Sequence, residues 1–75
     1  MTTQMQPLSH REWQVLALLA QGRSNPEIAQ QLVISIHTVE KHLTHIYAKL
    51  TVKSRSAACQ WVWEHPEYWK NTGIP

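Results

Sequence analysis

Residues 24–43 constrain the fold of this chain most, because they carry the start signals of two successive short helices. Ser24 and Glu27 have the spacing of a capping box, in which the serine hydroxyl accepts from the backbone N–H of the glutamate and the carboxylate accepts from that of the serine. A second cap follows at Ser35, between aliphatic residues with the spacing of a hydrophobic staple, Ile34 and Val39. The segment therefore predicts two helices joined by a tight turn.

The second helix of this pair, expected over residues 36–50, has two unlike faces. One is an apolar stripe at helical spacing, made of Val39, Leu43, Ile46, Tyr47 and Leu50. At about 100° per residue, the opposite face carries small polar and basic side chains, namely His37, Lys41, Thr44 and Ala48, flanked by Thr38 and His45. A helix that rests on a short partner and shows such a face to water is suited to a DNA major groove.

Helix signals on both sides of this pair predict an all-α, four-helix fold. A capping box of Ser9 and Glu12 opens a first helix, which Gly22 can end in the left-handed conformation. Ser54 caps a last helix, and Pro66 stops it. The expected helices cover about 10–21, 25–32, 36–50 and 55–65.

The length of 75 residues allows one domain, near the lower limit for a chain that folds around its own core. We expect a flexible segment at residues 1–7, the helical domain at 8–65 and an irregular tail at 66–75. In that tail, Tyr68 and Trp69 can pack back on the domain.

Several classes of protein are disfavoured by the sequence. The longest apolar run, Val15 to Ala20, is too short to span a bilayer, and the amino end does not resemble a signal peptide. The lone Cys59 excludes an intramolecular disulfide framework and fits a reducing cytoplasm. We therefore expect a cytoplasmic protein that does not enter a membrane.

Neither an enzyme nor a metal site is expected. Glu12 and Glu27 are explained as caps, and the chain has no nucleophile–base pair and no phosphate-cradling glycine loop. His42, His45 and Cys59 suggest zinc, but a closed zinc site needs a fourth ligand, and no paired-cysteine spacing supplies it. We expect no cofactor.

Positive charge gathers on the third helix and the turn that follows it. Residues 36–55 hold four of the seven basic residues and one of the five acids, namely Lys41, Lys49, Lys53 and Arg55 against Glu40. This is the distribution of an electrostatic footprint for nucleic acid. A solvated helix face accounts for the same charge, so charge alone leaves both interpretations open.

The spacing of many residues along the chain resembles the helix-turn-helix domain of the LuxR/NarL/FixJ (GerE-like) family of bacterial transcription regulators. The resemblance runs from Leu8 to about Val62. Its motifs are Leu8-Ser9-x-Arg11-Glu12-x-x-Val15-Leu16, Leu19-Ala20-x-Gly22-x-Ser24-Asn25-x-Glu27-Ile28-Ala29, Leu32-x-Ile34-Ser35-x-x-Thr38-Val39-x-x-His42-Leu43 and Ile46-x-x-Lys49-Leu50-x-Val52-x-Ser54-Arg55-x-x-Ala58.

The resemblance implies double-stranded DNA as partner, a roughly palindromic operator, a homodimer on DNA and RNA polymerase as a further candidate partner. Matching family positions imply phosphate contacts by Thr38, His42, Lys49 and Arg55. The fourth helix makes the dimer in such proteins, which points to the outward strip of Cys59 and Trp63. The alternative is that the tail covers this strip. Whether the chain is a stand-alone regulator or a piece of a longer one with a receiver or sensor domain stays open.

The residues themselves predict base contacts by His37, Glu40, Lys41 and Thr44 on the third helix. Lys41 can donate to guanine O6 and N7 or meet only phosphate, and Thr44 can touch a thymine methyl. Phosphate contacts are further expected from Asn25, at a helix start, and from His45. His42 borders the apolar stripe, so a purely structural role is equally open.

Two residues depart from the family pattern, Pro26 and Glu40, each where a lysine is common. Glu40 either accepts from cytosine N4, orients Lys41 or Thr44, or merely weakens binding. Glu40 and the low net charge also keep open a different function. In that alternative, the domain pairs with another regulator through its fourth helix and does not read DNA.

Overall fold

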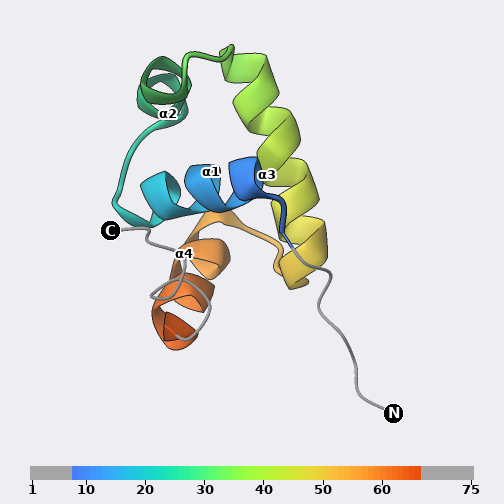
Figure 1. Cartoon of the computed structure of the whole chain (residues 1–75). Coiled ribbons are helices and arrows are strands. Elements are labelled where there is room, and N and C mark those ends of the chain that lie inside the picture. Colours follow the sequence, from blue (N-terminus) through green and yellow to red (C-terminus); the bar gives the residue numbers. More distant parts are fainter. Residues whose placement is uncertain (1–7, 67–75) are drawn as a thin grey trace.

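The computed structural model describes residues 8–66, and within them every regular element is a helix. The helices are α1 (His10–Ala20), α2 (Asn25–Leu32), α3 (Ile36–Leu50) and α4 (Arg55–Glu64). Figure 1 shows α1 in the middle of the molecule, with α2 above it, α4 below it and the long α3 running past its amino-terminal end. The predicted all-α, four-helix fold is confirmed. The expected flexible segment 1–7 and tail residues Tyr68 and Trp69 lie outside the described residues.

A serine begins each helix, as the sequence predicts. In every case the serine hydroxyl accepts from the backbone N–H three residues on, at 3.1 Å for Ser9, 3.3 Å for Ser24, 3.0 Å for Ser35 and 3.1 Å for Ser54. Such caps satisfy N–H groups that have no partner within the helix. The helix starts are therefore fixed locally, which explains why they were predictable.

The core lies between α1 and the other three helices, and α1 packs against each of them. The apolar residues of α1 pack with the predicted stripe of α3. In that stripe Val39, Leu43, Ile46 and Leu50 are buried and Tyr47 is half-buried. Smaller contributions come from Ile28 and Ala29 of α2 and from Ala58 and Val62 of α4. The stripe packs one side of α3 into the core, and the opposite side of α3 remains at the surface.

The expected outward direction of Cys59 is wrong. Its side chain is half-buried and packs against the core, and its Sγ donates to the carbonyl oxygen of Leu19 at 3.6 Å. Cys59 stands three residues before Val62, so it lies only about 60° around the helix from a buried side chain. Trp63 does point outward, with 61% of its surface exposed.

Candidate nucleic-acid interface

The turn between α2 and α3 is short and held by backbone hydrogen bonds. Ile34 N–H donates to the carbonyl oxygen of Ala29 at 2.9 Å, and Val33 takes the left-handed conformation with φ 59°. Ile34 is also half-buried against the core. These contacts fix the direction in which α3 leaves α2, and so give the helix-turn-helix unit a defined geometry.

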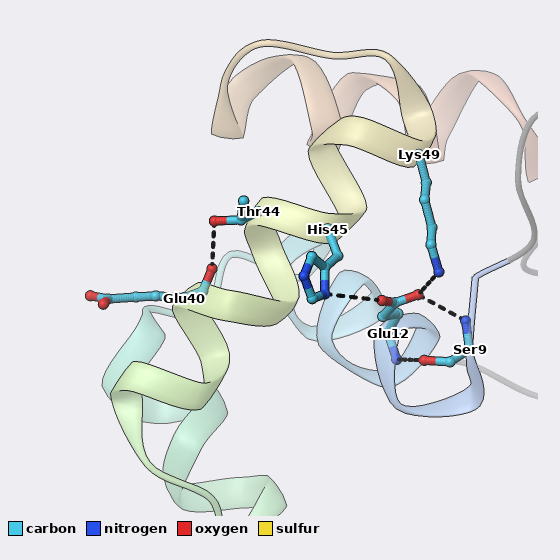
Figure 2. Close-up of polar contacts among 6 residues, drawn as sticks. All are labelled: Ser9, Glu12, Glu40, Thr44, His45 and Lys49. Carbon is cyan, nitrogen blue, oxygen red and sulfur yellow. Dashed lines mark hydrogen bonds and ion pairs between the residues drawn. The ribbon is translucent and has the colours of Figure 1, made fainter.

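The outward face of α3 carries all four predicted base contacts. His37, Glu40, Lys41 and Thr44 are exposed. The hydroxyl of Thr44 donates to the backbone oxygen of Glu40 at 3.0 Å, and the Glu40 carboxylate extends away from α1 (Figure 2). The hydroxyl hydrogen of Thr44 is therefore engaged within α3, which leaves its lone pairs and its methyl group for a ligand.

Two further predicted contacts, Thr38 and His42, border this face and are half-buried. Thr38 Oγ1 lies 2.9 Å from the hydroxyl of Ser35, so it extends the cap of α3. Its backbone N–H is bound by the same serine. The two residues thus lie at the rim of the exposed face rather than at its centre.

Two predicted phosphate contacts, Asn25 and Arg55, are bound to each other although they are 30 residues apart in the sequence. One guanidinium nitrogen donates to the side-chain oxygen of Asn25 at 2.8 Å, and the other donates to the carbonyl oxygen of Arg23 at 2.5 Å. Both acceptors are neutral, so the guanidinium keeps its full charge beside the start of α2. The sequence predicted each residue separately but not their contact.

Lys49 and His45, expected to touch phosphate, lie against a buried acid of α1. Lys49 Nζ is 2.8 Å from Glu12 Oε1, and His45 Nδ1 is 3.9 Å from Glu12 Oε2 (Figure 2). Glu12 is 5% exposed and also completes the capping box by accepting from Ser9 N–H at 2.9 Å. The predicted phosphate contact Lys49 is thus engaged in an ion pair within the protein.

The electrostatics of Glu12 follow from these partners. Burial alone would raise the pKa of its carboxyl, but hydrogen bonds from Lys49 and the Ser9 backbone, with the charge of Lys49, hold the pKa below its ordinary value. Removing one partner from a buried ion pair typically costs about 3–5 kcal/mol. The pair therefore fixes the carboxyl-terminal half of α3 on α1.

Sequence reasoning assigned Glu12 only a cap, although the sequence holds a signal for more. Glu12 stands three, four and seven residues before Val15, Leu16 and Leu19, all of which are buried. An acid at that spacing lies on the buried face of a helix and needs a partner. What the sequence does not supply is which cation provides it.

The two residues of the predicted strip on α4 do not form one exposed surface. Trp63 is exposed, whereas Cys59 packs against the core near the carboxyl end of α1. Nor do His42, His45 and Cys59 form a cluster. Within residues 8–66, no three histidine, cysteine or acidic side chains are placed to share a metal ion.

Comparison with known proteins identifies this arrangement. A family model described as bacterial regulatory proteins, luxR family, matches residues 6–62. The chain belongs to this family. The family's helix-turn-helix domain implies DNA binding in transcription regulation.

The luxR-family chain is also similar to a solved structure, the response regulator ChrA of a heme-sensing two-component system. The two share 44% sequence identity with a TM-score of 0.76. The match covers 85% of this chain and 32% of ChrA, so the chain spans about a third of that protein. Among the described residues, no helix has the length and apolar character to cross a membrane.

Proposed function

We propose that this luxR-family domain binds a specific duplex DNA site with α3 in the major groove. The observation that carries the proposal is the exposed face of α3, where His37, Glu40, Lys41 and Thr44 lie opposite the buried stripe. In helix-turn-helix proteins the amino-terminal part of the second helix reaches the base edges. All four residues lie within the first nine residues of α3.

Each side chain has a distinct role in this proposal. Lys41 donates to guanine O6 and N7. Thr44 presents its methyl group to thymine or accepts a hydrogen bond, because its hydrogen is engaged by the Glu40 backbone. The Glu40 carboxylate, which is exposed and extends away from α1, accepts from cytosine N4.

The rim of the face supplies the contacts that position α3 without reading sequence. Thr38 and His42 border the face on α3, and Arg55 with Asn25 forms a cationic group at the start of α2. Phosphate oxygens accept from such groups, and these bonds fix register and orientation. His45, which is exposed on α3, lies beyond the rim and completes this set.

The test is selection from a pool of random duplexes, followed by variants on the selected site. We expect an enriched motif. Lys41→Ala should lose about 1–3 kcal/mol of discrimination at one base pair, whereas Arg55→Ala should weaken binding to all duplexes and flatten the salt dependence. A pool without an enriched motif contradicts the proposal and favours the alternative of a protein-interaction module.

Dimerisation through α4 is the second part of the proposal, and the exposed Trp63 supports it. A large aromatic side chain at the surface is typical of a contact between proteins. On a two-half-site operator, Trp63→Ala should weaken binding far more than on a single half-site. Equal losses on both duplexes would rule out a dimer through this residue. Trp63 would then contact the carboxyl-terminal tail or another regulator.

A further inference from the structure

The carboxyl-terminal half of α3 carries two basic side chains near α1, of which His45 stays largely exposed and Lys49 is mostly buried. Figure 2 shows His45 and Lys49 reaching toward Glu12 on α1, whereas Glu40 and Thr44 lie on another side of α3. Lys49 Nζ is 2.8 Å from the Glu12 carboxylate, and His45 is 3.9 Å from it. One acid therefore lies against both bases of this half-helix.

A phosphate competes poorly with Glu12 for Lys49. The side chain of Glu12 is 6% exposed, so a departing Lys49 would leave a buried carboxylate without its cation. The Lys49 side chain is itself only 25% exposed. The ion pair thus holds the ammonium within the protein, and its charge is offset at 2.8 Å by a charge of opposite sign.

We infer that Glu12 is a specificity-determining residue of the DNA site, because it keeps Lys49 from attracting phosphates of any sequence. Contacts to phosphate raise affinity for all duplexes alike, whereas base contacts discriminate between them. With Lys49 held, the attraction of α3 for DNA depends on its amino-terminal half, where Lys41 lies. The inference rests on the proposed placement of α3 in the major groove.

The variant Glu12→Gln tests this inference with little change of shape. Glutamine also serves at the third position of a capping box, so the start of α1 is kept. The variant removes the charge that holds Lys49. Affinity for a random-sequence duplex is measured between about 50 and 200 mM salt. The plot of log affinity against log salt should steepen by about 0.9, one phosphate, which is about 3.5-fold over this range.

Two further variants isolate Lys49. In Glu12→Gln/Lys49→Met the slope should return to that of the wild type, because the released cation is gone. Glu64→Gln removes one exposed negative charge at the end of α4 and is the control for net charge. It should leave the slope unchanged, and it should also keep the ratio of specific to non-specific affinity, which Glu12→Gln lowers.

Three results would overturn the inference. One is an unchanged slope in folded Glu12→Gln, another is an equal rise in Glu64→Gln, and the third is a double variant whose slope is flatter than that of the wild type. The last result would mean that Lys49 already holds a phosphate, and it decides the matter even when the single variant does not fold. A wild type that binds no duplex contradicts the proposed function instead, so the two failures are distinguishable.

Discussion

Helices α1 and α2 start from the same motif and use it differently. Both begin with a Ser-x-x-Glu capping box of nearly equal geometry, and the glutamate accepts from the serine N–H at 2.9 Å in α1 and 2.8 Å in α2. Glu12 is buried, whereas Glu27 is exposed. The first box is also the joint between α1 and α3, through Lys49, and the second box is local.

The lowered pKa of each glutamate shows the same contrast in its causes. For Glu27 the largest cause is the hydrogen bond from the Ser24 backbone, and burial, which comes second, opposes it. For Glu12 burial is the largest influence and acts in the opposite direction, and Lys49 with Ser9 outweighs it. A capping motif thus reports where a helix begins and says nothing of how much tertiary structure depends on it.

The largest expected effect separates the two glutamates by stability. Glu12→Ala removes the cap and leaves Lys49 without its buried partner, so we expect a loss of about 3 kcal/mol, the lower end for buried pairs because Lys49 is partly exposed. Glu27→Ala removes an exposed cap and should cost much less. Urea denaturation of both variants measures the difference. Equal losses would show that the ion pair adds nothing to the cap.

Acid should separate the same two residues. A carboxyl whose pKa is lowered on folding stabilises the protein above its ordinary pKa of 4.5, and this contribution is lost as the pH falls through the lowered value. We expect Glu12→Gln to flatten the loss of stability below about pH 4.5 more than Glu27→Gln does, because protonation of Glu12 also breaks its ion pair with Lys49. Urea midpoints between about pH 2.5 and 6 test this. A larger flattening in Glu27→Gln would reverse the comparison.

The sequence predicts the parts of the structure that are local. The serine caps and the exposed face of α3 depend on spacings of three and four residues, so both follow from periodicity. The Glu12–Lys49 contact spans 37 residues and the Asn25–Arg55 contact spans 30. Such contacts depend on how the helices pack. The misplaced Cys59 has a different origin, because its spacing of three residues from the buried Val62 already places it near the inward side of α4.

The smallest expected effect concerns how α1 and α2 end. Gly22 follows α1 with φ 89°, whereas Val33 ends α2 with φ 59°, although a β-branched residue is strained in the left-handed region. Val33 is 88% exposed, so its side chain gains little from burial. Val33→Gly should relieve strain of about 1–2 kcal/mol and lose about 0.5–1 kcal/mol to chain entropy, a net gain of about 0–1.5 kcal/mol. The reverse test is Gly22→Ala, which meets no neighbour within 4 Å, so its effect is backbone strain less the chain entropy that alanine saves, without a steric contribution. A thermal midpoint that falls in Val33→Gly would show that the valine side chain stabilises the turn, and α2 would then end by packing rather than by conformation.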